Sequence, residues 1–391
     1  MKLRTVIRYR TVKKILSLFV YVSAVLLMSF TTFGYDHVGE YGEEYEEELS
    51  EYDFTDIDNA LKEEDIDFKQ LVSRLAGGDS DGVFYELFTI IMDRLFGDIL
   101  YNRNVVVKII FIAIISAMFT NMSIIIKRSE MSETGFYVTY MLMVTILTGG
   151  FIVMSDMVRE AVSRIITFMN ALVPAFLLSV GVAAGSMSAA GFSGVILMAI
   201  GIIEKLILSF LIPAVNVYVI IRLVNNIVEE DYFSKLAGVI KTSILWALKG
   251  MVGVLLGANI IQSIIMPSVD AAGTGVINKL INILPGGEAV TGIEGIVTTT
   301  GNVIKNAIGS AGLIALAVIC LFPMIKMLIY IAVYKVTSAI IQPIADKRLG
   351  DSIDAVSEGI GILYKVTFTV AFLLFITVAI ICFSTNIKIG V

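Results

Sequence analysis

Long apolar stretches recur along this chain from Val105 to Phe383, and charged segments separate them. The first stretch, Val105–Ile126, is long enough to cross the roughly 30 Å hydrocarbon layer of a bilayer as an α-helix. Lipid offers backbone groups no hydrogen-bond partners, so repeated stretches of this kind indicate a bundle of transmembrane helices. The hydrophobic content of 57% and the mean hydropathy of +0.86 agree. The sequence therefore predicts an all-α, polytopic membrane protein.

About seven spans are predicted after a signal segment. Two of them are broken apolar regions that contain Pro213 or Pro323 together with charged residues, and each of these is either one kinked helix or two short helices. The predicted spans are Val105–Ile126, Phe136–Met154, Ile165–Ala184, Phe192–Val228, Val239–Gln262, Ala311–Ile344 and Gly359–Phe383. Residues 105–391 form the predicted membrane domain.

The N-terminus has the pattern of a signal peptide over residues 1–34. A basic segment precedes an apolar stretch from Ile15 to Phe30, and small residues follow at Thr32 and Gly34. An uncleaved anchor is the alternative. In both cases the basic end stays in the cytoplasm and residues 35–104 form an acidic, exported leader.

The leader contains 15 acidic residues and one lysine between Tyr35 and Asp67. Apolar residues recur at helical spacing from Ile57 to Leu75, so short amphipathic helices are expected there. Without those 15 acids and one lysine, the chain carries 28 basic and 20 acidic residues, against 29 and 35 in the whole. These bases are scattered among apolar stretches, so nucleic-acid binding is not indicated.

Two segments next to predicted spans have the pattern of amphipathic, interfacial helices. One apolar stripe comprises Val158, Ala161, Val162, Ile165, Ile166 and Met169; the other comprises Leu349, Ile353, Val356, Ile360 and Leu363. The first segment resembles the second, and residues 239–244 are a looser third copy. Duplication and shared helix-start chemistry explain this resemblance equally well.

The region from Ser263 to Ala311 is too polar to span and too apolar for a simple linker. Two amphipathic stripes flank a corner at Pro285, Gly286 and Gly287. The pattern fits a pair of short helices, either re-entrant and lining a polar cavity or lying on the membrane surface.

Several ionisable residues fall in apolar surroundings, where a charge needs a bundle interior, water or a partner. Lysines predominate among them. We therefore expect an aqueous path or an assembly whose other subunits supply acids. The candidate residues are Lys249, Lys326, Lys335, Lys365, Glu204, Pro285, Gly286, Gly287, Gln342, Pro343 and Asp346.

Composition argues against common enzyme chemistry. The single histidine, His37, lies in the acidic leader, so a catalytic triad or a two-histidine zinc helix has no support. Cys320 and Cys382 lie in apolar stretches and are expected to pack as small apolar residues. No phosphate-binding or dinucleotide-binding motif occurs. We predict no catalytic residues, no cofactor and no metal.

Five short motifs, in this order and spacing, resemble the stage III sporulation protein AE family. They are Leu172–Phe176, Gly185–Ala190, Ile283–Gly287, Gly309–Gly312 (followed by Pro323 and Lys326) and Gln342–Asp346. With the signal segment, the leader and the length, the resemblance covers nearly the whole chain. The tyrosine-rich part of the leader matches no family pattern.

The resemblance implies a non-enzymatic role in endospore formation. The family belongs to a secretion-like complex in the mother-cell membrane around the forespore, with ring-forming subunits and a cytoplasmic ATPase encoded in the stage III sporulation A operon. This complex joins stage II sporulation protein Q across the intermembrane space. A self-sufficient secondary transporter with broken helices is the alternative. An intramembrane enzyme fits least, since the histidine lies in the leader and the spans lack paired aspartates.

Overall fold

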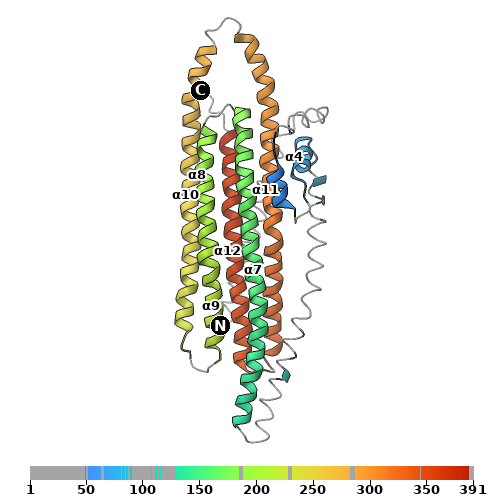
Figure 1. The fold of residues 1–391 in the computed structure, drawn as a ribbon, viewed down its shortest axis with the longest axis vertical. Coiled ribbons are helices and arrows are strands. Elements are labelled where there is room, and N and C mark those ends of the chain that lie inside the picture. The colour runs from blue at the N-terminus through green and yellow to red at the C-terminus, as the bar shows by residue number, and fades with distance from the viewer. Residues whose placement is uncertain are drawn as a thin grey trace.

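The computed structural model describes residues 52–62, 66–80, 129–184, 188–227, 231–281, 287–343 and 345–386, with isolated residues between 49 and 115. All regular structure in these ranges is helical. Long antiparallel helices lie side by side in one elongated bundle (Figure 1). In chain order they are α7 (Ser129–Ala184), α8 (Ser188–Leu206), α9 (Ile212–Asn225), α10 (Ser234–Ile281), α11 (Gly287–Ile341) and α12 (Lys347–Asn386).

The described residues contain five helices that are long and apolar enough to cross a membrane. They include the segments 134–180, 196–225, 234–258, 303–341 and 347–380. The fold class predicted from the sequence, an all-helical multi-pass bundle, is confirmed. The predicted span Val105–Ile126 and the signal segment lie largely or wholly outside the described residues, so the number seven stays a prediction.

Helix α7 joins two segments that the sequence analysis treated as separate spans. Phe136–Met154 and Ile165–Ala184 lie in one helix of 56 residues, which is about 84 Å long at 1.5 Å per residue. The charged segment between them does not end the helix, because its apolar stripe continues the buried face without interruption. The helix is therefore more than twice as long as a bilayer's hydrocarbon layer is thick.

The two regions predicted to be kinked or broken, at Pro213 and at Pro323, are each continuous along the bundle. We call each such continuous helical segment of the bundle a rod. Helices α8 and α9 are joined by a π-helical turn, Ile207–Leu211, directly before Pro213. A π-turn accommodates the missing amide hydrogen of a proline without ending the helix. Helix α11 continues through Pro323, and α7 through Pro174.

The region Ser263–Ala311 does not form separate short helices in the described residues. Its first part extends α10 to Ile281, and its second part begins α11 at Gly287. The two extensions reach beyond the ends of the other long helices at the top of Figure 1. Pro285 and Gly286, the predicted corner, lie outside the described residues.

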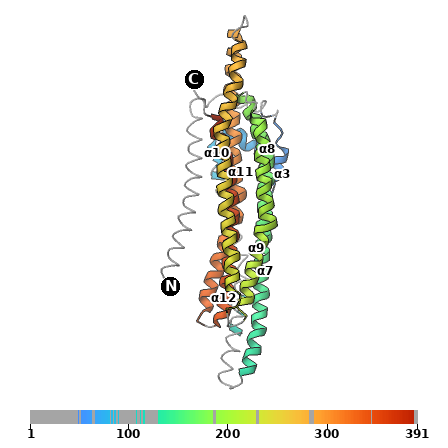
Figure 2. The same ribbon diagram turned by 90° about the vertical axis from the view of Figure 1, so that its left-hand side faces the viewer.

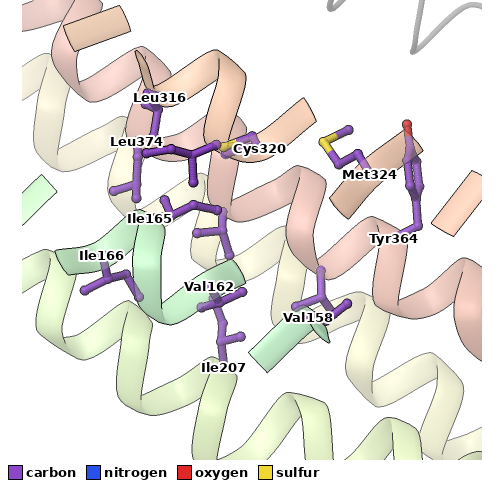
Figure 3. Close-up of a cluster of buried hydrophobic side chains, with 14 of the residues drawn as sticks. Val158, Val162, Ile165, Ile166, Ile207, Leu316, Cys320, Met324, Tyr364 and Leu374 are labelled. Atoms are coloured by element: carbon purple, nitrogen blue, oxygen red, sulfur yellow. The ribbon is translucent and has the colours of Figure 1, made fainter. Parts of the chain in front are cut away.

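Helix α12 lies between α8 and α7 in Figure 1 and packs against α7, α9, α10 and α11. In the view of Figure 2, α10 runs in front of it. Both predicted apolar stripes are buried, with every member at most 1% exposed. Figure 3 shows part of this core, where Val162 of α7 lies beside Ile207, Ile165 of α7 lies near Leu374 of α12, and Met324 of α11 lies near Tyr364 of α12. Cys320 is buried in the same cluster, as expected.

Two short helices of the leader pack on the outside of the bundle. Helix α3 (Thr55–Leu61) contacts α7, and α4 (Phe68–Ala76) contacts α11. Asp67 caps α4 by accepting a 2.8 Å hydrogen bond from the amide of Gln70. The Phe68 ring meets the Phe168 ring of α7 edge-on, with centroids 6.3 Å apart. The expected amphipathic helices are therefore present, and their apolar faces are covered by the bundle.

Candidate functional site

The described part of the bundle carries a set of polar side chains around α12. The apolar stripe of α12 packs into the core, and the residues between its members include Asp354 and Glu358. Glu358 is partly buried against neighbouring helices, whereas Asp354 is exposed.

Glu358 is the centre of a cluster that joins three helices. Its Oε2 accepts a 2.7 Å hydrogen bond from the Tyr218 hydroxyl of α9, and its Oε1 pairs with the Lys241 ammonium of α10. The side chains of Lys241 and Glu358 are 26% and 23% exposed. We call Tyr218, Lys241 and Glu358 the Glu358 cluster. In such surroundings the two charges satisfy one another, and the phenol satisfies a further carboxylate lone pair.

Gly359 explains how α12 comes close enough for this contact. A Cβ atom at Gly359 would lie 2.1 Å from Cγ2 of Val219 and 3.0 Å from Cε2 of Phe151. Only glycine permits that approach, and Val219 is the chain neighbour of Tyr218. The bare backbone at Gly359 thus brings the Tyr218 hydroxyl within reach of Glu358.

Further hydrogen bonds cross the bundle toward the end that carries the α9–α10 and α11–α12 turns, which we call the turn end. Ser155 of α7 donates to the amide oxygen of Asn216 of α9 at 2.8 Å. The buried Tyr140 hydroxyl donates to the carbonyl of Leu223 at 2.7 Å and lies 2.9 Å from the Ser352 hydroxyl. These bonds link α7, α9 and α12 through polar groups.

Arg348 ties the first turn of α12 to its surroundings. It pairs with Asp346, 3.2 Å from Nε to Oδ1, and its guanidinium lies 3.7 Å from the centre of the Phe136 ring. Among the sequence-predicted candidates, Asp346 is thus a partner of Arg348. Gln342 and Pro343 lie exposed in the neighbouring turn.

The predicted lysines occupy different environments. Lys335 of α11 is exposed and lies within electrostatic range of Asp354, which hydrogen-bonds Ser338. Lys249 of α10 is exposed, whereas Lys326 and Lys365 are half-buried, as is Glu204 of α8. Gly287 is the first residue of α11. The structure does not bring these candidates into a single site.

The Glu358 cluster was not among the sequence-predicted candidates. A signal for it exists, because Lys241 and Glu358 lie in two of the three similar segments and carry opposite charges. Among the described residues, no group of three histidine, cysteine or acidic side chains could hold a metal ion. The cluster is a hydrogen-bonded ion pair that can orient polar groups or hold helices together.

Fold and polar interior together define a multi-pass, all-helical membrane protein with ionised side chains between its helices. Comparison with known proteins gives the family: the stage III sporulation protein AE family matches residues 66–385, and the chain belongs to it. The chain is 23% identical over 316 residues to Stage III sporulation protein AE of Bacillus subtilis (strain 168). That match covers 79% of this chain and 78% of the relative. No solved structure matches the chain. The resemblance seen in the sequence is confirmed, and it implies a role in sporulation.

Proposed function

We propose that this protein is a non-enzymatic membrane subunit of a secretion-like channel between mother cell and forespore. Family membership supports the sporulation role, and the multi-pass bundle supports a membrane subunit. The proposed location is the mother-cell membrane around the forespore. The proposed partners are the other proteins of the stage III sporulation A operon, including ring-forming subunits and a cytoplasmic ATPase, and indirectly stage II sporulation protein Q.

The Glu358 cluster is the observation that carries the proposal. Ionised side chains between membrane-spanning helices are costly unless they face one another, water or a partner, and they commonly mark functional positions. The cluster joins α9, α10 and α12, so it controls how these helices are arranged. A membrane subunit that moves polar cargo, or that holds other subunits around such a path, requires polar groups in this position.

A sporulation assay tests this proposal. We expect Glu358→Gln and Lys241→Met, introduced into a spore-forming host that relies on this gene, to lower the yield of heat-resistant spores strongly. Vegetative growth and the amount of protein in the membrane should stay unchanged. Glu160→Gln is the matched control, because Glu160 is exposed on α7 and outside the cluster. Normal spore yield in both cluster variants would contradict the proposal.

A self-sufficient secondary transporter is the second candidate function. The π-helical turn before Pro213 and the ion pair of the Glu358 cluster favour it, because π-turns and charges between membrane-spanning helices are frequent at functional sites. Purified protein in liposomes separates the two candidates. A transporter moves a solute without other proteins, whereas a channel subunit requires its partners.

A further inference from the structure

Charged side chains occur on all five long rods at about half the height of the bundle. We call them the charged belt: Asp156, Arg159, Glu160, Arg164, Glu204, Lys205, Lys249, Lys326 and Lys365. Arg159 of α7 donates to the carbonyl of Leu208, three residues beyond Lys205, at 3.4 Å. Figure 3 places Val158, Met324 and Tyr364, which are sequence neighbours of belt residues, toward one end of the same core cluster. Counted from the contact of Gly359 with Val219 and Phe151, Lys365 lies about 9 Å further along the bundle, Arg164 about 20 Å and Glu204 about 22 Å. The belt is therefore a broad band across the bundle.

The belt divides the bundle into two halves of similar height. At 1.5 Å per residue, the belt lies roughly 22–32 Å from the helix end at the turn end on α8–α9, α10, α11 and α12, and about 40–52 Å from the start of the longer α7. On α12, for example, Lys365 lies about 27 Å beyond Lys347, and the helix continues for about 32 Å to Asn386. Each half matches the roughly 30 Å hydrocarbon layer, so helix length does not show which half lies in lipid.

The leader helices distinguish the two halves. Helices α3 and α4 pack on the half beyond the belt, where Phe68 meets Phe168 (Figure 1). Their outer faces expose ionisable side chains, among them Asp56, Lys62 and Lys69. If hydrocarbon surrounded the bundle at this level, it would also surround these charged groups, which is strongly unfavourable. Water must therefore reach this half of the bundle.

Large apolar side chains are exposed in both halves, with Leu178, Met198 and Val254 beyond the belt, so the leader helices distinguish the halves and the half next to the turn end is compatible with lipid. Large apolar side chains are exposed there on α7, α9, α10 and α11, including Val153, Val217, Trp246 and Val336. Tyr137, Tyr232 and Phe233 lie exposed near the turn end, and Trp246 lies one helical turn from the belt. Aromatic residues gather at the two edges of a hydrocarbon layer in this way.

We infer that lipid surrounds only the half of the bundle between the turn end and the charged belt, with headgroups at the belt. The half beyond the belt, with the leader helices, projects from the membrane. Lys249, Lys326 and Lys365 then lie at the membrane surface, where a lysine reaches water or phosphate, rather than at the bilayer centre. This inference is independent of the proposed channel role.

Native tryptophan content allows a direct test, because Trp246 is the only tryptophan of the chain. In a Trp246→Phe background, Val217→Trp places the fluorophore below the belt and Leu178→Trp places it beyond the belt. Both positions are exposed and apolar, at 47% and 66%, so neither substitution disturbs the core. The full-length proteins are reconstituted into vesicles of brominated or ordinary phosphatidylcholine, and fluorescence is compared.

We expect brominated lipid to quench the tryptophan at position 217 strongly and to leave the one at position 178 unquenched. Quenching at 178, with or without quenching at 217, would overturn the inference, because lipid would then cover the projecting half. Absence of quenching at 217 would also overturn it. Circular dichroism of both variants checks that the helical content is retained.

Discussion

Lys241 and Glu358 show how an ionised pair is kept between helices in an apolar bundle. Each charge lies about three-quarters buried, and Tyr218 supplies a hydrogen bond to the same carboxylate. Removing one member leaves the other charge in surroundings that solvate it poorly. The pair should therefore behave as a unit, in which the loss of either partner is worse than the loss of both charges together.

A double-mutant cycle tests this coupling. Lys241→Met and Glu358→Gln should each destabilise the purified protein by about 1–3 kcal/mol, and the double variant by clearly less than the sum. Denaturant unfolding in detergent, followed by circular dichroism, measures the free energies. Lys241→Met combined with Glu160→Gln should be additive, because Glu160 lies on the exposed face of α7. Additivity in both combinations would mean that the pair contributes no coupling.

At the level of the elements, the approach of α12 to its neighbours depends on Gly359. Val219 of α9 and Phe151 of α7 occupy the space in which a side chain would lie. Gly361 lies two residues further along the same helix. A Cβ atom added at Gly361 would have no neighbouring atom within 4 Å. The two glycines thus offer a matched pair in the same helix with different packing.

Gly359→Ala should separate α12 from α9 and lower the free energy of unfolding by about 1–3 kcal/mol, the usual cost of overpacking. Gly361→Ala should be neutral or slightly stabilising, since alanine favours helix more than glycine does. Thermal unfolding of the two purified variants in detergent makes the comparison. Equal effects of the two substitutions would show that the close approach of α9 to Gly359 does not determine the stability of the bundle.

For the whole molecule, the continuous rods determine which segments share a membrane face. The α9–α10 and α11–α12 turns lie at the same end of the bundle, and the leader helices lie toward the other. Lys235, Lys347 and Arg348 are at the turn end, and basic flanks favour the cytoplasmic side. The leader is acidic, which agrees with export.

Reporter fusions test this topology. A reporter that is active only in the cytoplasm should be active when fused after Ile227 or Gln342, and inactive when fused near Lys62. A reporter that is active only after export should give the opposite pattern. Opposite locations for the two turns would mean that one of the proline-containing rods crosses the membrane twice in the cell.

The sequence by itself determined the helical class, the buried stripes and the family. Val158, Val162 and Ile165, like Leu349, Ile353 and Val356, were predicted as apolar faces and are buried, because helical periodicity is a local property that three or four turns reveal. The family motifs are local in the same sense. The leader helices followed from the same periodicity between Ile57 and Leu75.

Only the tertiary structure decided where helices end and which polar groups meet. From the sequence, Pro213 and Pro323 were interpreted as breaks or kinks in helices. In the structure, both segments are continuous rods that pack against neighbouring helices. Lys241 and Glu358 are 117 residues apart, and although they lie in similar segments with opposite charges, no local pattern shows that they are in contact. Their contact depends on the bare backbone of Gly359 against Val219, and a close approach between distant helices is fixed only when the whole core packs.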